Sequence, residues 1–524
     1  MTAVGGPSRR SALGLLGLAS IAAGSQRASR RGTSRSAAAA GLSATIEQII
    51  GQPQFQGAQW GMEFSRFGSA TPVYSMSGDQ VFVPASAAKV FTAGTVFSTM
   101  GPGYRFRTPV YGTGPVTGGV LNGDLVLVAS GDLLLSNRVQ PDGTLALPIP
   151  DHSYDMPDTV PVPGDPLRPL RDLARQVAAC GVSQVGGSVL IDTSLFAQSQ
   201  TSIGVSAAGL VTISPVMIND NIVDVTVTPA SQAGAPGVLH VSPQTGYVQI
   251  VSQVTTVPAS DPAPAPLSFA SDVTNPDGTH TVVLTGDIPV NTPHLYRAYY
   301  VPEPARFTAM AFAQTLRDAG IGAQAGIPGT APPYLPRGLL AEHVSPPVFE
   351  EVKVMLKTSS NVHTAMWEYV DGAVAGPGSA DPTAAYGELM ARLFQEAGLD
   401  PSPPGYTPAF FVKFLAYMAR QPYFSLYRDA LPIMGKDGDL ATVEAGSPAA
   451  GHVYAKTGTG LGGTASSPLI DKALAGYIRP PDGCWIAFAE FMDLGISSPA
   501  ALMPVADAVG EAMGAIAAAV YKYS

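Results

Sequence analysis

The sequence changes its pattern twice along its length, and this constrains the fold more than any single motif. Residues 41–106 and 303–524 combine helical periodicity with apolar strands, whereas residues 107–302 consist mainly of short Val-, Thr- and Leu-rich runs separated by Gly, Pro and Asp. We therefore expect an α/β (α+β) domain that is discontinuous in the chain, with a β-rich region inserted into it. The strand pattern from about 224 to 295 is typical of a second subdomain within the insertion.

The flanking parts begin with a predicted hairpin. Trp60–Phe64 and Val73–Met76 alternate apolar and polar residues on either side of a Gly-Ser-Ala turn, as paired strands do. Pro84 then stands at the start of a helical pattern that is ended by the Gly-Pro-Gly stretch from Gly101. Periodicity predicts helices at 167–179, 304–319, 347–371, 384–397 and 499–522, and strands at 473–478 and 485–491.

The composition excludes several classes of protein. The formal net charge of −10 argues against nucleic acid or an anionic membrane surface as a partner, because phosphate contacts require a surplus of Lys and Arg. Cys180 and Cys484 are the only cysteines, too few for a disulfide framework or a Cys-based zinc cluster, and we expect two free thiols. The seven histidines contain no H-E-x-x-H motif, so a zinc peptidase of that type is not expected.

The N-terminus has the features of an export signal. Arg9 and Arg10 precede a short uncharged apolar run, Gly14–Gly24, and small residues follow near position 40. We interpret residues 1–40 as a signal peptide and basic tail; a disordered basic tail without an export role is the alternative. No other run of 18 apolar residues occurs, so we expect no transmembrane span and an exported, secreted or wall-associated protein.

A serine and a lysine lie three residues apart at the start of a predicted helix. In Ser86-Ala-Ala-Lys89 both side chains project from one face, so that the amine is within hydrogen-bonding reach of the hydroxyl. The unpaired N–H groups of the helix start can stabilise a developing negative charge nearby. Alone the pattern is weak, because roughly 0.7 such pairs are expected by chance in a chain of this composition.

Two further motifs follow in the C-terminal part. Ser359-Ser-Asn361 places a hydroxyl and a carboxamide together, although in isolation it is more typical of a surface turn or helix cap. Lys456-Thr457-Gly458 comes directly after a strand-like segment and precedes Thr459. Lys and Thr on a strand edge can bind a carboxylate, and the next backbone N–H can help to form an oxyanion hole.

The three motifs occur once each, in the order S-x-x-K, S-x-N, K-T-G, which is the signature of active-site serine DD-peptidases and class A β-lactamases. From about 42 to 524 the chain resembles the penicillin-binding D-alanyl-D-alanine carboxypeptidase/endopeptidases with large inserted domains, peptidase family S13. The resemblance implies a β-lactamase-like transpeptidase domain with the insertion between the first two motifs. Its marks include Pro84–Lys89, Gly103–Arg107, Gly123–Val128, Asn219–Asn221, Ser345–Pro347, Lys357–Asn361, Leu431–Ile433, Gly435–Gly438, Lys456–Thr459 and Leu474–Tyr477.

The resemblance also implies a role for each residue of the first two motifs. Ser86 is the expected nucleophile and Lys89 its general base, while the backbone N–H groups of Ser86 and Thr459 hold the oxyanion. Ser359 relays a proton to the leaving group. Asn361 fixes Lys89 and the substrate amide. No metal and no organic cofactor are implied.

For the third motif the resemblance implies substrate binding. Lys456 is counted among the catalytic residues and, with Thr457, is expected to bind the terminal carboxylate of the substrate; Gly458 and Thr459 complete that strand edge. The implied substrates are peptidoglycan stem peptides ending in D-Ala-D-Ala, and β-lactam antibiotics are the implied covalent inhibitors.

Two alternatives stay open. A β-lactamase or esterase uses the same three motifs, and a catalytically weak wall-binding homologue would keep the same fold. The chain departs from the family pattern at Gly131–Leu135, in the short segment before Leu431 and in the Gly/Ser-rich stretch 460–467. The segment before Leu431 keeps the second alternative open, whereas the intact residues of the three motifs argue against it.

Overall fold

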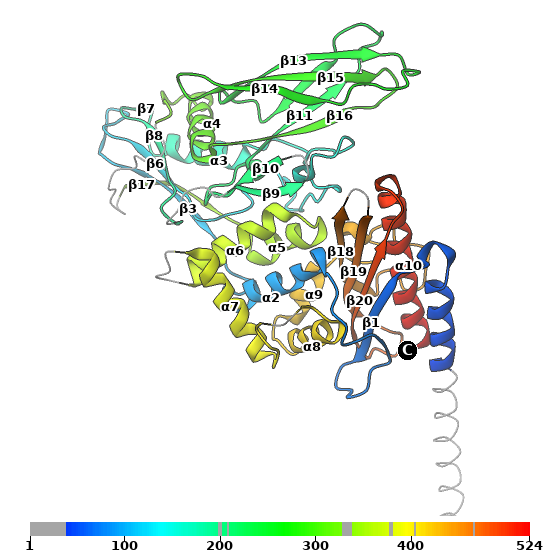
Figure 1. Ribbon diagram of the computed structural model, residues 1–524. Helices are drawn as coiled ribbons and strands as arrows, with labels where there is room; N and C mark the ends of the chain where they lie inside the picture. The colour runs from blue at the N-terminus through cyan, green and yellow to red at the C-terminus, as the bar shows by residue number, and fades with distance from the viewer. Residues whose placement is uncertain are drawn as a thin grey trace, which may run out of the picture.

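The computed structural model describes residues 38–196, 202–206, 209–326, 338–376, 381–402, 405–464 and 467–524. The expected signal peptide, including Arg9 and Arg10, lies outside the described residues, which begin with the helix Ala38–Ile50. Figure 1 shows two parts, a helical and sheet-containing part that carries both ends of the described chain and a β-rich part made from the middle of the sequence.

A five-stranded antiparallel sheet joins the two ends of the sequence. Its order is β18-β19-β20-β1-β2, so that the predicted hairpin is confirmed and lies beside strands from the C-terminal part. One face packs against α10 and the helix Ala38–Ile50, and the other against the helical layer (Figure 1). The strands are β1 Gln59–Arg66, β2 Tyr74–Met76, β18 Val453–Thr464, β19 Ser467–Ile478 and β20 Ile486–Gly495.

The helical layer is built around α2, which is buried along its length from Lys89 to Phe97. Its neighbours α5, α6, α7, α8 and α9 pack aromatic and aliphatic side chains against it. Periodicity did not predict α8 or α9. The elements of the layer are η2 Ala85–Ala88, α2 Lys89–Thr99, α5 Val348–Lys357, α6 Asn361–Ala375, α7 Pro382–Glu396, α8 Pro408–Met418 and α9 Phe424–Ala430.

The single helix expected at 347–371 is wrong, because the chain breaks between α5 and α6. Ser359 adopts a left-handed conformation with φ 60°, which an α-helix does not accommodate. Ser360 then caps α6 by accepting a hydrogen bond from the backbone N–H of His363. The break places the whole S-x-N motif at a helix junction.

The middle of the chain forms a second core. A four-stranded sheet of order β17-β3-β6-β8 packs against α3 and α4, and two three-stranded sheets lie beyond it, of orders β12-β11-β16 and β13-β15-β14 (Figure 1). The main elements are β3 Arg107–Gly112, β6 Leu125–Val128, α3 Arg168–Ala179, β8 Val189–Asp192, β11 Ile222–Thr228, β12 Val238–Ser242, β13 Val248–Val257, β14 Ser268–Thr274, β15 His280–Pro289, β16 Leu295–Tyr300, α4 Pro304–Asp318 and β17 Leu339–Val344.

Short elements connect these layers. They are η1 Pro53–Phe55, β4 Val116–Thr117, β5 Val120–Leu121, η3 His152–Tyr154, β7 Gln184–Val185, β9 Ser202–Ser206, β10 Gly209–Thr212, η4 Asn219–Asn221, η6 Gly438–Leu440 and η7 Pro499–Ala501. Of these, η3 and η4 belong to the inserted region and η6 to the flanking domain, and all three prove to lie at the candidate site.

The elements that follow residue 302 pack with the β-rich part of the molecule. Phe307 and Leu316 of α4 are buried in the core of the β-rich part, and β17 pairs with β3. We therefore propose that the inserted region extends to about residue 344 and that the flanking domain resumes with Ser345.

Among the described residues, α10 (Leu502–Tyr523) is the one helix long and apolar enough to cross a bilayer. Half of its most apolar window is buried, and Val509 and Ile516 lie in the core beneath the sheet. This is the position of a core helix. The two cysteines are free and exposed, as predicted.

Candidate active site

Ser86 and Lys89 lie at the start of the buried helix α2. The helix begins with the 3-10 turn η2, which carries Ser86, and Ala85 before it has φ 44°. Lys89 Nζ is 2.7 Å from Ser86 Oγ and 2.7 Å from Oδ1 of Asn361, which stands at the first position of α6. The structure therefore brings together the amine, the hydroxyl and the carboxamide expected from the sequence.

The environment of Lys89 favours its neutral form. The side chain is only 4% exposed, and burial, followed by the nearby positive charge of Lys456, holds its pKa well below the ordinary 10.5, although Asp439 and Asp151 act in the opposite direction. A neutral amine 2.7 Å from a hydroxyl can accept the hydroxyl proton.

The K-T-G strand lies against the turn that carries Ser86. β18 is an edge strand of the sheet and runs directly beside η2. A Cβ at Gly458 would lie 2.4 Å from the carbonyl oxygen of Pro84 and 3.1 Å from the backbone nitrogen of Ala87, so a side chain there would push the strand away from Ser86. Thr459, the next residue, is exposed, and its hydroxyl accepts a hydrogen bond from Lys472 Nζ at 2.8 Å.

The K-T-G strand is paired with an acidic residue that sequence analysis missed. Asp439 Oδ2 is 2.7 Å from Nζ of Lys456, which is fully buried, and the hydroxyl of Thr457 donates to the same oxygen. Asp439 follows one of the quoted motifs, Gly435–Gly438, but no spacing in the sequence indicates that η6 brings it to β18.

A cavity of about 300 Å³ opens at Ser86 and Lys89. It extends from Asn361 along α6 past Thr364 to Glu368, a carboxyl whose pKa is raised by burial. Sequence analysis missed Glu368 as well. The remaining lining residues are Ala85, Ala88, Phe91, Thr92, Tyr386, Met390 and Tyr406.

The inserted region contacts the S-x-N loop directly. The hydroxyl of Tyr154, in η3, donates to the backbone carbonyl of Ser359 at 2.6 Å. The hydroxyl of Thr358 lies 3.2 Å from Oδ2 of Asp151, two residues before Ser153 in the same turn. Ser359 is therefore held in its left-handed conformation by a turn that lies more than 200 positions earlier in the chain.

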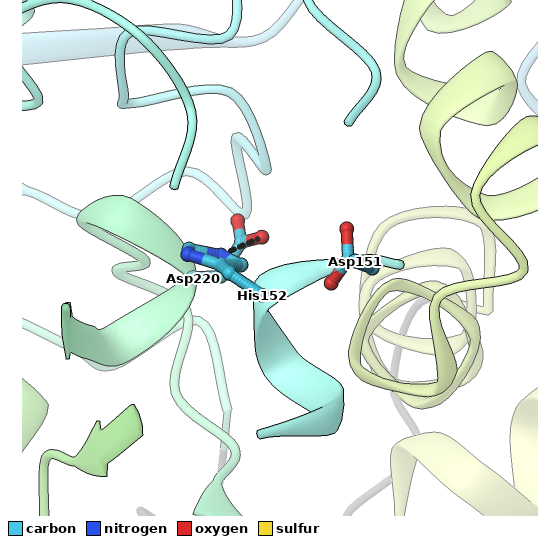
Figure 2. A group of neighbouring side chains, drawn as sticks. All are labelled: Asp151, His152 and Asp220. Atoms are coloured by element: carbon cyan, nitrogen blue, oxygen red, sulfur yellow. Dashed lines mark hydrogen bonds and ion pairs between the residues drawn. The ribbon is translucent and has the colours of Figure 1, made fainter. Parts of the chain in front are cut away.

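A buried charge network lies behind that turn. Arg138 donates to both Asp151 (2.7 Å) and Asp220, and Asp220 also pairs with His152 at 2.9 Å and His363 at 3.2 Å. Figure 2 shows the two aspartates with His152 on η3. The network joins η3 and η4 of the insertion to the first turn of α6, the helix that carries Asn361.

Asp151, His152 and Asp220 lie close enough to one another to suggest a metal site, with ligand atoms within 4.8 Å (Figure 2). Their chemistry does not fit one. Arg138 already occupies an oxygen of each carboxylate. Burial alone would lower the pKa of His152, but Asp224 and Asp220 raise this pKa to about 10. The ring is therefore protonated and cannot ligate a cation.

The fold and the pocket define the class of protein. A serine–lysine pair at a helix start, an S-x-N loop and a K-T-G edge strand on an antiparallel sheet flanked by helices are the features of active-site serine DD-peptidases and their β-lactamase relatives. The chain belongs to the family described as D-Ala-D-Ala carboxypeptidase 3 (S13), whose model matches residues 42–402 and 405–511. It is therefore a hydrolase of the serine carboxypeptidase type.

Known relatives cover most of the chain. A D-alanyl-D-alanine carboxypeptidase of Actinomadura sp. (strain R39) is 25% identical over 493 residues, covering 88% of this chain and 82% of that protein. Penicillin-sensitive carboxypeptidase A of Dictyostelium discoideum is 21% identical, covering 78% of each. The crystal structure of penicillin binding protein 4 from Haemophilus influenzae superposes with a TM-score of 0.63 at 19% identity, covering 91% of this chain and 98% of that one. At this identity the structural match speaks for the fold alone.

The buried network predicts a large effect of Arg138 on stability. Arg138→Met leaves Asp151 and Asp220 buried without their cation, so we expect the free energy of unfolding to fall by about 3–5 kcal/mol. Arg66→Met is the matched control, because Arg66 pairs with Asp482 at the surface, and it should cost at most about 1 kcal/mol. Denaturant unfolding measures the free energy of unfolding of both variants. Equal losses of this free energy in the two variants would contradict a buried network.

Proposed function

We propose that this chain hydrolyses the peptide bond between the two D-Ala residues of a peptidoglycan stem peptide through an acyl-enzyme on Ser86. Carboxypeptidase and endopeptidase substrates share the acylation of Ser86. The observation that carries the proposal is the position of Lys89 Nζ, 2.7 Å from both Ser86 Oγ and Asn361 Oδ1, with a depressed pKa. Such an amine is the base that a serine nucleophile requires.

The proposed reaction has two halves. Ser86 Oγ attacks the carbonyl carbon of the penultimate D-Ala while its proton passes to Lys89, and the backbone N–H groups of Ser86 and Thr459 stabilise the oxyanion. Ser359 relays a proton to the nitrogen of the leaving D-Ala, and the C–N bond breaks. Water then attacks the ester, which releases the shortened peptide and restores the hydroxyl of Ser86.

Substrate binding is assigned to the edge strand. We propose that β18 aligns the substrate backbone, with Lys456, Thr457 and Thr459 facing the leaving residue and Gly458 allowing the strand to approach η2. Penicillins mimic the same acyl group and should react with Ser86. A solved complex of the Haemophilus influenzae protein with a β-lactam supports that expectation.

A peptidoglycan substrate requires the enzyme to act outside the cytoplasm. We propose that Arg9 and Arg10 open the export signal, as the sequence indicates, and that the mature enzyme is secreted or associated with the cell wall. The proposed function requires neither a nucleic-acid partner nor a membrane span.

The position of Glu368 bears on the β-lactamase alternative. Glu368 lies seven residues after Asn361 on α6, about 10 Å further along the helix axis at 1.5 Å per residue. Glu368 lines the same cavity as Ser86, but no hydrogen bond among the described residues joins it to Ser86 or Lys89, so it is not assigned as a base for hydrolysis of the Ser86 ester. We therefore favour the peptidase, in which the penicillin adduct is hydrolysed slowly.

The first prediction concerns the adduct. Benzylpenicillin should add its full mass covalently to Ser86, because the opened lactam stays attached to the serine oxygen, and Ser86→Ala should abolish the adduct while leaving the fold unchanged. Intact mass measurement followed by peptide mapping locates the label. An adduct on another residue, or none, would refute the mechanism.

The second prediction concerns pH. Acylation requires neutral Lys89, so the acylation rate should rise with pH through a pKa well below 10.5. Lys456→Ala removes a positive charge that lowers this pKa and leaves Asp439, which raises it, so the rise should move to higher pH. Lys413→Ala, at an exposed position, is the control and should leave the profile in place. If the pH profile of acylation stays in place in Lys456→Ala, the charge of Lys456 does not act on the pKa of Lys89.

The third prediction concerns Tyr154 as a positioning residue. Tyr154→Phe removes the hydroxyl that holds the Ser359 carbonyl, so the rate of acylation by penicillin should fall roughly three- to tenfold with little change in stability. Tyr417→Phe, which removes a surface hydroxyl bonded to Glu396, should react as the wild type does. Equal rates for the two variants would show that the insertion does not position the S-x-N loop.

A further inference from the structure

The cavity at Ser86 extends away from the K-T-G strand. Its volume of about 300 Å³ lies between η2 and α2 on one side and α6 and α7 on the other. Among the described residues that line it, none belongs to β18 or to the inserted region, and in Figure 1 α7 stands on the side of α2 away from β18. The proposed function assigns β18 to the leaving residue, so this cavity is left for the acyl side of the scissile bond.

One face of α6 forms a wall of the cavity. Asn361, Thr364 and Glu368 are three and four residues apart, so their side chains project from the same face of the helix. Asn361 accepts from Lys89 at one end of this wall, 2.7 Å away. Glu368 stands about two turns further along the helix, and helical side chains lean toward the N-terminus, which brings its carboxyl back toward Asn361.

Glu368 is a carboxyl without a partner. Its side chain is half-buried, burial raises its pKa, and within the described ranges it forms neither a hydrogen bond nor an ion pair. Carboxylates removed from water are normally paired or hydrogen-bonded, because the charged form is costly when it is left alone. Of the described residues that line the cavity, Lys89 is the one with a basic side chain, and it lies at the opposite end with a pKa well below 10.5.

A second carboxyl lies just beyond Glu368. Asp371, one turn further along α6, is fully buried and accepts a hydrogen bond from the hydroxyl of Thr99 at 2.6 Å. Burial raises the pKa of the Tyr386 hydroxyl, and the nearby charges of Glu368 and Asp371 raise it further, whereas two threonine hydroxyls of α2 act in the opposite direction. Both acids therefore lie close to the α7 wall, and this end of the cavity attracts positive charge.

We propose that the cavity is a subsite for a cationic group on the acyl side of the substrate, and that Glu368 binds the ammonium at the end of that group. A basic side chain of the peptide, or an aminoalkyl substituent of a penicillin, would run along the α6 wall with its carbon chain against Met390 and Tyr406. The inference rests on the proposed function, because acylation of Ser86 places the acyl group at the mouth of the cavity. Glu368 is thus a residue that determines specificity.

The test uses three penicillins that share one lactam nucleus and have acyl chains of equal length. The aminohexanoyl compound ends in an ammonium, the heptanoyl compound in a methyl group and the adipoyl compound in a carboxylate. The second-order rate of acylation of Ser86 is measured for each. In the wild type the aminohexanoyl compound should react about tenfold faster than the heptanoyl compound, because it forms a charge-assisted hydrogen bond with Glu368, and the adipoyl compound should be the slowest.

Variants of Glu368 assign the preference to this side chain. In Glu368→Gln the ratio of the aminohexanoyl rate to the heptanoyl rate should fall to about one, and the ratio cancels any change common to both compounds. Glu388→Gln, at an exposed position of α7, is the matched control and should keep the wild-type ratio. Glu368→Lys should reverse the order, so that the adipoyl compound becomes the fastest of the three.

The outcomes separate this inference from the proposed function. If none of the compounds labels Ser86 in the wild type, the proposed function fails. If all three label it at equal rates, or if the preference for the amine persists in Glu368→Gln, the subsite is wrong while the acyl-enzyme mechanism stands. The comparison within the wild type needs no substitution, and the heptanoyl rate shows in each variant whether the enzyme is folded and competent.

Discussion

The site depends on keeping one buried lysine neutral beside a charged one. Lys89 and Lys456 share a pocket in which both side chains are removed from water, and two ammonium groups could not be accommodated there without a counter-charge. Asp439 forms an ion pair with Lys456 at 2.7 Å, whereas it acts on Lys89 only from further away. Within the described part of the chain, Lys89 is hydrogen-bonded to the neutral groups of Ser86 and Asn361, and burial and the charge of Lys456 favour loss of its proton.

The insertion is part of this arrangement, although it lies outside the catalytic domain in sequence. Asn361 is 272 positions from Lys89, and the junction that presents it depends on Ser359 remaining in a left-handed conformation. The turn carrying Asp151 and Tyr154 contacts that junction from the inserted region, and the Arg138 network keeps the turn buried. A buried ion network specifies one geometry, because breaking any member leaves an unpaired charge.

Much of the site could be predicted from the sequence, because its three motifs are local. Ser86 and Lys89 are three residues apart, and Gly458 follows Lys456 on one strand, so local geometry decides their relation. What could not be predicted arises from distant contacts. Asp439 and Tyr154 reach the site by way of loops without periodicity, which the sequence does not place relative to β18 or α6. The break before Asn361 was missed for a related reason: its sequence is compatible with a helix, and tertiary contacts to Ser359 override that preference.

The titration of Lys89 itself tests the central claim most directly. With eight lysines in the chain, labelling the lysine side chains with ¹⁵N or ¹³C gives few resonances, and the Lys89 signal is the one lost in Lys89→Arg. We expect this signal to titrate well below 10.5 in the free enzyme, before any substrate or penicillin is added. A Lys89 resonance that titrates at or above 10.5 would mean that the amine is charged at neutral pH, and it would contradict a role for Lys89 as the base.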